Sequence, residues 1–312
     1  MNIGQKYILS VDIGGSKLMA GIIDYYNGNI ILKESIPLKA AITEDYLVEN
    51  ILFIIKDLIS QCSDIDVSCI GVSVPGTADS KNGVLIYACY SGIRNFEIGK
   101  ILKEIFHIPV FVENDVNACA FGEKIFGACK EIDDFIWVTI SNGVGGALVL
   151  NGNVYEGRFK GAGEIGHINV VEDGYTCGCG NKGCLEAYAS GSGIVRRYKE
   201  KSQNNFAEIT AKIIAEDAHK GDELALEIYR ETGYFLGKAI SYAVNIINPQ
   251  KVILGGGIST DIDLFLPEIN NIVDKMVFQD PNKNLIIEKT ALSYEAALIG
   301  AAAIAKYRFE RI

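Results

Sequence analysis

The sequence predicts an α/β protein built from two similar halves, and three observations carry that prediction. Short apolar runs of strand length alternate with segments whose apolar residues recur at helical spacing. Each half contains a glycine-rich turn early in it, at residues 12–17 and 142–146. No Pro- or Ser-rich linker separates the halves, so we expect a duplicated fold around a cleft, with a soft boundary near residue 117.

Each half is expected to begin with a strand meander and to continue with helices and further strands. In the first half we expect strands over residues 7–11, 18–23, 29–33, 69–74 and 110–112, and helices over residues 46–62, 98–106 and 115–126. In the second half we expect strands over residues 135–140, 147–150, 152–155, 252–254 and 285–288, and helices over residues 185–199, 208–219, 223–247 and 294–308.

Composition limits the classes of partner. The chain has 312 residues, 49% of them hydrophobic, which is enough for one large domain or two ordinary ones. Its net charge of −10 repels phosphate backbones, so we expect no nucleic-acid partner. Its apolar stretches are too short to cross a bilayer and its start lacks the pattern of a signal peptide, so we expect a cytoplasmic protein with no membrane partner. Eight cysteines in such a chain indicate thiols or metal ligands rather than disulfides.

Glycine-rich turns follow three of the expected strands. In the first, Gly14 and Gly15 allow exposed N–H groups to hold phosphate oxygens, and Asp12 could hold Mg²⁺ through water. Taken alone, this segment is better explained as a plain hairpin turn. A second turn at residues 142–146 and a third at residues 255–257 change the balance, because one nucleotide cradle made from two halves accounts for all three.

One imidazole and three thiols lie close together in the sequence, at His167, Cys177, Cys179 and Cys184. Glycines between them free the backbone to wrap an ion, and the ligand set is that of a closed tetrahedral zinc site. A redox thiol cluster is the alternative, which the histidine and the glycines disfavour. Four protein ligands leave no position open for water, so the zinc is expected to be structural.

Two glutamates flank this cluster. Glu164 precedes His167 by three residues, and Glu186 follows Cys184 by two. A metal ion that fixes the ligands therefore also fixes two carboxylates, which are good acceptors for sugar hydroxyls. Without the metal, each glutamate is better explained as a solvated surface charge.

Asp115 is the candidate general base. It lies at the end of an expected strand, where α/β proteins place ligands, and an aspartate accepts the hydroxyl proton in other phosphoryl transfers. The alternative is a helix N-cap, a position that Asp favours. Spacing alone leaves these two roles evenly balanced.

These motifs together resemble the ROK family (repressors, open reading frames and kinases), and within it the bacterial glucokinases. The resemblance runs over residues 8–303. Its most specific element is Glu164-Ile165-Gly166-His167 followed by the Cys177-Gly178-Cys179-Gly180 and Gly183-Cys184-Leu185-Glu186 segments, which are similar to the family's zinc signature.

The resemblance implies an actin-like, ribonuclease-H-like ATPase fold in two domains, with ATP and sugar in the interdomain cleft. The small domain would comprise residues 1–117 and 298–312, the larger zinc-containing domain residues 118–297, and the final helix would pack on the first domain. ATP contacts would come from Asp12 (with Mg²⁺), Gly14, Gly15, Ser16, Lys17, Asn142, Gly143, Gly145, Gly146, Gly255, Gly256 and Gly257. Sugar contacts would come from Gly76, Asn114, Asp115, Glu164, His167 and Glu186, with Asp115 as the base. Family members suggest a homodimer or homotetramer.

Two segments depart from the family pattern. The second phosphate loop usually contains Gly-Thr-Gly, whereas this chain has Ser141-Asn142-Gly143, which puts nucleotide affinity in question. Glucose kinases usually have a Pro-Asn-Leu segment whose Asn touches the sugar, whereas here residues 88–93 are Ala-Cys-Tyr-Ser-Gly-Ile. This second departure puts the identity of the hexose in question more than the chemistry.

The function expected from the resemblance is ATP-dependent phosphorylation of glucose at the 6-hydroxyl, in carbohydrate metabolism. N-acetylmannosamine, mannose, fructose or a β-glucoside are alternative substrates. A sugar-responsive repressor is a rival of another class, but family repressors carry an N-terminal helix-turn-helix domain, for which the residues before Asp12 leave no room. A sugar sensor without catalysis is a further rival, against which the presence of both Asp12 and Asp115 argues.

Overall fold

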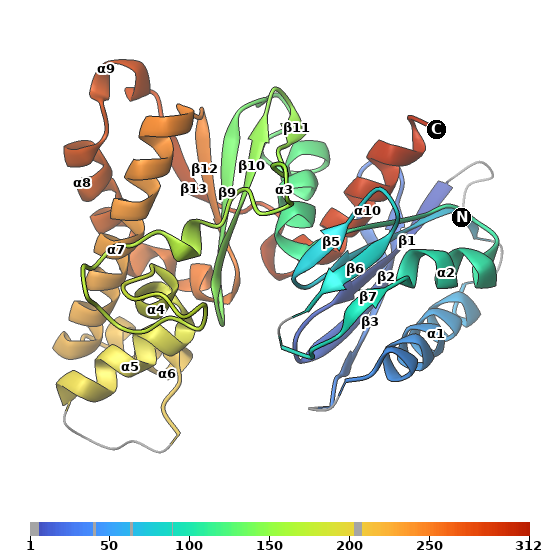
Figure 1. The fold of residues 1–312 in the computed structure, drawn as a ribbon, viewed down its shortest axis with the longest axis horizontal. Helices are drawn as coiled ribbons and strands as arrows, with labels where there is room; N and C mark the ends of the chain where they lie inside the picture. Colours follow the sequence, from blue (N-terminus) through green and yellow to red (C-terminus); the bar gives the residue numbers. More distant parts are fainter. Residues whose placement is uncertain (1–5, 40–41, 63–64, 89, 203–207) are drawn as a thin grey trace. The chain divides into compact units, whose positions relative to one another are not determined.

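The computed structural model describes residues 6–39, 42–62, 65–88, 90–202 and 208–312. It divides into two compact units, each described here by itself (Figure 1). Unit 1 comprises Met1–Glu131, Glu156–Gly161 and Ala291–Ile312. Unit 2 comprises Ile132–Tyr155 and Ala162–Thr290.

Unit 1 is organised around a five-stranded sheet in the order β3-β2-β1-β4-β8. The strands are β1 (Lys6–Ile13), β2 (Lys17–Asp24), β3 (Ile30–Pro37), β4 (Asp66–Val74) and β8 (Val110–Asn114). The first three form an antiparallel meander, and β4 and β8 continue the sheet in parallel with β1. The carboxyl ends of β1, β4 and β8 therefore lie at one edge of the sheet, where Asp12 and Asp115 are found.

Helices cover both faces of this sheet because its strands are apolar on both sides. Leu9 and Val11 of β1 pack in one core with α1 (Glu44–Ser60) and α2 (Ile98–Phe106), whereas Ile8 packs in a second core with α10 (Ala296–Phe309). Figure 1 shows α1 and α2 on the other side of the sheet from α10. Small residues let α10 approach closely: a Cβ added to Gly71 would lie 1.9 Å from the carbonyl oxygen of Ala301.

Unit 2 repeats this sheet with the same order and the same strand directions, β11-β10-β9-β12-β13. The strands are β9 (Phe135–Ile140), β10 (Val144–Leu150), β11 (Asn153–Val154), β12 (Lys251–Gly255) and β13 (Ile286–Lys289). The predicted duplication of the α/β unit is therefore confirmed. The strand expected over residues 147–150 begins earlier, so Gly145 and Gly146 belong to β10 rather than to the turn.

The helices of unit 2 differ from the prediction at two points, because one expected helix is divided and the helices α8 (Leu266–Met276) and α9 (Gln279–Asn282) were not predicted. The single helix expected over residues 185–199 is wrong, because the chain forms α4 (Glu186–Ala189) and α5 (Gly191–Ser202). Ser190 between them is extended, with φ −71° and ψ 165°, and its hydroxyl accepts the N–H of Gly193, as in a helix N-cap. The other helices are α6 (Ala211–His219) and α7 (Glu223–Ile247).

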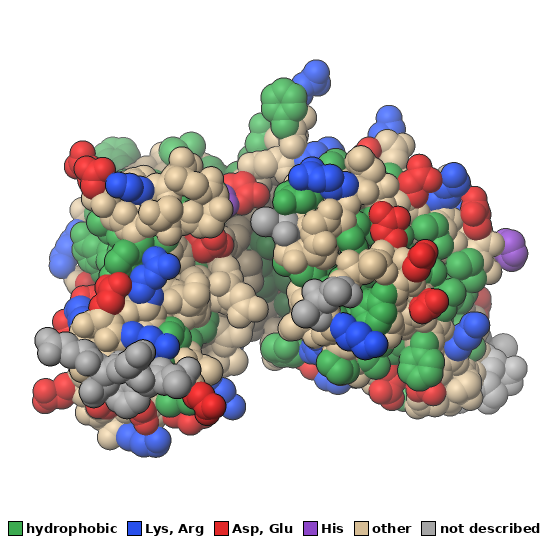
Figure 2. Space-filling view, turned by 60° about the horizontal axis from the view of Figure 1, so that its bottom comes forward, with side chains coloured by type: hydrophobic (Ala, Val, Ile, Leu, Met, Phe, Trp, Pro, Cys, Tyr) green, Lys and Arg blue, Asp and Glu red, His purple; other side chains and the backbone are tan. Residues whose placement is uncertain are grey.

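Unit 1 also contains a three-stranded sheet that was not predicted, made of β5 (Thr77–Asp79), β6 (Val84–Tyr87) and β7 (Arg94–Phe96). The boundary expected near residue 117 falls inside α3 (Asp115–Ile125), and the whole of α3 lies in unit 1. Among the described residues, no helix combines the length and the apolarity needed to cross a membrane. On the face drawn in Figure 2, described basic side chains are interspersed with acidic ones.

Candidate functional site

The first glycine-rich turn joins β1 to β2 and is closed by its own backbone, because the N–H of Gly14 donates to the carbonyl of Lys17 at 2.9 Å. Asp12, in β1, lies opposite Ser73 of β4 in the sheet register. Ser73 is fully buried, and its hydroxyl donates to Oδ1 of Asp12. Burial raises the pKa of Asp12, while the bond from Ser73 and the charge of Lys17 act in the opposite direction. A carboxylate oriented in this way can hold a hydrated cation through its other oxygen.

The junction between β8 and α3 carries the candidate base. Oδ1 of Asn114 accepts the backbone N–H groups of Val116 and Asn117, each at 3.0 Å. The amide nitrogen of Asn114 donates to the carbonyl of Gly76 and to Oδ1 of Asp115, both at 2.8 Å. Asn114 is therefore the N-cap, and the alternative that made Asp115 the cap is wrong. Asp115 is the first residue of α3, and its carboxylate is oriented by its neighbour.

The carboxyl group of Asp115 binds a proton more tightly than an ordinary aspartate does. Burial in this junction raises its pKa to about 7, and the negative charge of Asp12 adds to the effect. Hydrogen bonds from Val116 and Asn114 act in the opposite direction but are weaker. A carboxyl group with this pKa is partly ionised at neutral pH, so it can take up a proton from a nearby hydroxyl and later release it.

The segment that departs from the family pattern lies at the same place. Cys89 is outside the described residues, but Tyr90 is described and half-exposed. A Cβ added to Gly15 would lie 3.9 Å from the ring of Tyr90, so the ring covers the first turn. Burial raises the pKa of the Tyr90 hydroxyl, and the charges of Asp115 and Asp12 contribute. The position of Tyr90 near both carboxylates was not predicted.

An ion pair between Glu113 and Arg308 holds the junction between β8 and α3. This ion pair was not predicted from the sequence. Glu113 is 1% exposed and accepts a hydrogen bond from Arg308 of α10. Its other oxygen accepts the backbone N–H of Asn114 at 3.1 Å and the side-chain amide of Asn117 at 3.2 Å. An acidic residue that ends an otherwise apolar strand was a usable signal, because buried charges require partners.

The second glycine-rich turn, Ser141-Asn142-Gly143, joins β9 to β10 in unit 2. The N–H of Ser141 donates to the carbonyl of Gly143 at 2.8 Å. Two groups from outside the turn hold it: the carboxylate of Glu186 accepts the N–H of Val144 at 3.1 Å, and the N–H of Gly191 donates to the carbonyl of Ser141 at 2.8 Å. The turn is therefore attached to both ends of the short α4 segment.

The third turn, Gly255 to Gly257, lies beside the second. Gly256 has φ +86°, a conformation that favours glycine. A Cβ added there would lie 2.4 Å from the carbonyl oxygen of Ile140, the last residue of β9. The turn then enters the 3₁₀ helix η2 (Gly257–Leu264). Unit 2 thus brings two of the three predicted turns together.

The structure also brings the four candidate metal ligands together. The ligand atoms of His167, Cys177, Cys179 and Cys184 all lie within 4.8 Å of one another. Nδ1 of His167 is 3.8 Å from the sulfur of Cys177, and the sulfurs of Cys179 and Cys184 are 3.7 Å apart. Zinc bonds of about 2.0–2.3 Å in a tetrahedron place ligand atoms at such separations, so this donor set fits a zinc ion. The backbone N–H of Asn181 lowers the pKa of Cys179, which favours the thiolate that binds metal.

The two ring nitrogens of His167 face different partners. Nδ1 faces Cys177, whereas Nε2 is 3.9 Å from the carboxylate of Glu164. Glu164 is 60% exposed at its side chain, so it is accessible to a ligand. One nitrogen of His167 can therefore hold a metal ion while the other stays available to a second ligand.

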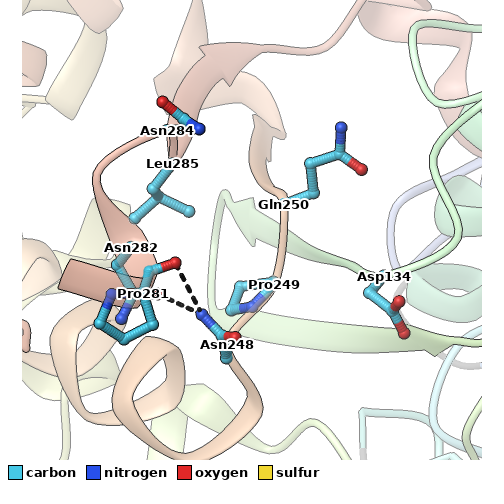
Figure 3. A pocket seen from close by; sticks show the side chains of 8 residues that line it. All are labelled: Asp134, Asn248, Pro249, Gln250, Pro281, Asn282, Asn284 and Leu285. Atoms are coloured by element: carbon cyan, nitrogen blue, oxygen red, sulfur yellow. Dashed lines mark hydrogen bonds between the residues drawn. The ribbon is translucent and has the colours of Figure 1, made fainter. Parts of the chain in front are cut away.

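A pocket of about 220 Å³ lies in unit 2 at the opposite end of the strands from its glycine turns (Figure 3). It is lined by Asp134, which precedes β9, by Gln250, which precedes β12, and by amide side chains. Asn248 donates to Asn282 across it at 2.8 Å. None of the predicted site residues lines this pocket.

Comparison with known proteins relates the chain to kinases and to regulators. It is 31% identical over 318 residues to a glucokinase of Halalkalibacterium halodurans, covering 97% of this chain and 96% of that enzyme. It is 30% identical over 301 residues to the xylose repressor of Bacillus spizizenii, covering 96% of this chain and 76% of the repressor. It is 34% identical over 243 residues to the N-acetylglucosamine repressor of Escherichia coli O157:H7, covering 76% of this chain and 60% of that protein.

Solved structures show the same relation. A ROK family glucokinase from Streptomyces griseus, in complex with glucose and AMPPNP, matches with a TM-score of 0.84 and 30% identity, covering 96% of this chain and 99% of that one. The two α/β units thus have the actin-like, ribonuclease-H-like fold of ROK kinases, and the predicted fold class is confirmed. The ROK family model matches residues 8–308, so this chain belongs to the ROK family.

Proposed function

We propose that this ROK protein transfers the γ-phosphate of ATP to a hydroxyl of a free hexose, with glucose at its 6-hydroxyl as the first choice. One observation carries the proposal: Asp115 begins α3 with its carboxylate bonded by Asn114, at the sheet edge that also carries Asp12, and burial there raises its pKa to about 7. A general base works best when its pKa lies near the working pH, and an aspartate accepts the substrate proton in other phosphoryl transfers.

The proposed nucleotide contacts come from backbone groups and one acid. Asp12, oriented by Ser73, would hold the Mg²⁺ that accompanies ATP. The N–H groups of the turns would hold phosphate oxygens, and the third turn would face the adenosine. The residues concerned, in the turns and in the strand ends next to them, are Gly14, Gly15, Ser16, Lys17, Asn142, Gly143, Gly145, Gly146, Gly255, Gly256 and Gly257. The similarity to a glucokinase structure that holds AMPPNP supports this assignment.

The proposed sugar contacts are Gly76, Asn114, Asp115, Glu164, His167 and Glu186. Two observations support them: Asn114 bonds both Gly76 and Asp115, and Nε2 of His167 faces Glu164. Zn²⁺ held by His167 and the three thiols would be structural, because it would orient the loops that carry these side chains.

A second candidate function is a non-catalytic sugar sensor or regulator. The xylose repressor is about as similar to this chain as the glucokinase is, which is the observation that favours it. Other substrates within the kinase proposal are N-acetylmannosamine, mannose, fructose and β-glucosides. We further propose a homodimer or homotetramer in the cytosol, where the described cysteines, none of which is in a disulfide, would remain reduced.

The test is a coupled ADP-release assay with Mg-ATP and a panel of hexoses, N-acetylated hexosamines and β-glucosides. We expect sugar-dependent release with one preferred sugar. We expect Asp115→Asn to lower kcat by about three orders of magnitude while sugar binding, measured by calorimetry, is retained. Normal turnover by Asp115→Asn would show that another group is the base. Sugar binding without ADP release in the unmodified protein would favour the regulator.

A further inference from the structure

Glu186 contacts both the metal cluster and the second glycine turn. It is the first residue of α4 and follows the ligand Cys184 by two residues. Its Oε2 accepts the backbone N–H of Val144 at 3.1 Å, and its Oε1 is 3.7 Å from the sulfur of Cys177. One carboxylate therefore spans the distance between the ligand loop and the turn.

The carboxylate lies directly against the turn. A Cβ added to Gly143 would lie 2.5 Å from Oε2 of Glu186, so a side chain at this position would displace the carboxylate. The other end of the same segment is attached as well, because the N–H of Gly191 donates to the carbonyl of Ser141. Residues 186–191 thus hold the turn at its first residue and just after its last.

The cluster has two ligand arms, defined as the segment that ends in His167 and the segment that runs from Cys184 to Glu186. The His167 arm also approaches strand β10. His167 ends the 3₁₀ helix η1 (Ile165–His167), and a Cβ added to Gly166 would lie 1.9 Å from the carbonyl oxygen of Val144. The N–H of Val144 is thus taken by one ligand arm, and its carbonyl is in close contact with the other. Both arms meet at the residue where β10 leaves the turn.

These contacts make the turn sensitive to the state of the cluster. A cation shared by His167 and Cys184 would tie the two arms together, and the position of Glu186 would follow from that of Cys184. A hydrogen bond from a backbone N–H to a carboxylate is among the stronger ones, so it can hold the turn in one conformation.

We propose that Glu186 couples metal binding in the cluster to the conformation of the second glycine turn, so that the affinity for nucleotide depends on metal occupancy. Glu186 acts here as a positioning residue, distinct from any contact it makes with sugar. The proposal rests on the proposed function in taking the second turn as part of the nucleotide site. It adds that the metal supports ATP binding as well as the sugar loops.

The first experiment measures Mg-AMPPNP binding by calorimetry in the absence of sugar, so that sugar contacts do not enter. We expect the zinc-loaded protein to bind about tenfold more tightly than protein stripped by a chelator. Glu186→Ala in the loaded state should lose about the same factor, and stripping it should cost little more, because the link is already broken. Glu186→Gln keeps an acceptor oxygen and should recover part of the affinity.

Glu172→Ala is the matched control, because Glu172 is an exposed acid on the same loop between the ligands His167 and Cys177. It removes the same charge and should leave nucleotide affinity unchanged. Equal affinity in the loaded and stripped protein, or additive losses in stripped Glu186→Ala, would overturn the coupling while the kinase proposal stands. Sugar binding without any AMPPNP binding by the loaded protein would overturn the proposed function itself.

A second measurement covers the case in which stripping unfolds the protein. Hydrogen exchange is followed in the loaded state, with zinc content checked by atomic absorption. We expect Glu186→Ala to keep its zinc and to exchange the amide of Val144 at least tenfold faster than the unmodified protein. Unchanged protection of Val144 in a zinc-loaded variant would show that Glu186 does not hold the turn.

Discussion

The two glycine turns occupy the same place in two sheets of identical strand order, yet they are supported differently. Each has three residues between its strands: Gly14-Gly15-Ser16 in unit 1 and Ser141-Asn142-Gly143 in unit 2. Both turns are closed by a backbone hydrogen bond, and the first follows an acid of its own strand, Asp12. The second has no acid in the corresponding strand β9, and a carboxylate reaches it from α4.

The difference shows that duplication of a fold repeats positions and not chemistry. Asp12 is the penultimate residue of β1 and Asp115 follows β8 in unit 1, whereas the matching positions in β9 and after β13 of unit 2 are Thr139 and Thr290. The proposed cation and base thus belong to one copy of the fold. Unit 2 holds the metal cluster and the second glycine turn attached to it. There the proposed phosphate contacts depend on the backbone conformation of the turn.

Replacing one side chain at each turn tests this asymmetry, and the replacement of Asp12 has the largest expected effect. Asp12→Asn should lower kcat by about a hundredfold and raise the Mg²⁺ concentration needed for half-maximal rate, because an amide holds a hydrated cation poorly. Asn142→Ala should raise the KM for ATP by less than about fivefold, because the turn acts through its backbone. Magnesium titrations of ADP release compare the two variants, and similar effects of both would remove the asymmetry.

Local features of the site were predictable from the sequence, because short chain segments determine them. The four metal ligands lie within one short segment, so their spacing alone predicted the cluster that the structure forms. The helices α2 and α7 have the predicted bounds, and Asp222 caps α7 through the N–H of Ala225. Asn114 and Asp115 were singled out correctly as neighbours at a strand end, although which of them caps the helix needed coordinates.

Contacts between distant segments were not predictable in this way. The strand pairing of Ser73 with Asp12 and the bond between Arg308 and Glu113 join residues far apart in the sequence. Periodicity carries no information on such pairs. The strands β5, β6 and β7 were missed because they are only three or four residues long. Glu186 was assigned to sugar on its spacing from Cys184, and its bond to Val144 emerged only from the fold.

The carboxylates of unit 1 should give the reaction a marked pH dependence. The pKa of Asp115 lies near 7, so its base form is lost at lower pH and kcat/KM for the sugar should fall about tenfold per pH unit below 7. Because the charge of Asp12 contributes to this pKa, the acid limb of Asp12→Asn should move to lower pH. Profiles of ADP release between pH 5 and 8 measure both, and identical limbs would show that the two carboxylates are not coupled.

The same shift predicts how stability depends on pH. Folding raises the pKa of Asp115 above its ordinary value of 3.8, so its contribution to the free energy of unfolding is fully present below pH 4 and is lost as the pH rises through 7. Asp115→Asn removes this dependence. Its stability relative to the unmodified protein should therefore increase between pH 5 and pH 8, by about 2 kcal/mol. Denaturant unfolding at both values measures the difference, and a constant difference would contradict the raised pKa.

The smallest expected effect concerns the ring of Tyr90, which covers the first turn. Tyr90 lies on Gly15 near both carboxylates, so we expect it to shape the sugar end of unit 1 rather than the phosphate contacts. Tyr90→Asn should change the KM for the preferred sugar by about fivefold and the KM for ATP by less than twofold, whereas Tyr90→Phe, which keeps the ring, should change neither by more than about twofold. A change confined to the KM for ATP would instead make Tyr90 a support of the first turn, as Glu186 is of the second, and the two turns would then differ only in which side chain holds them.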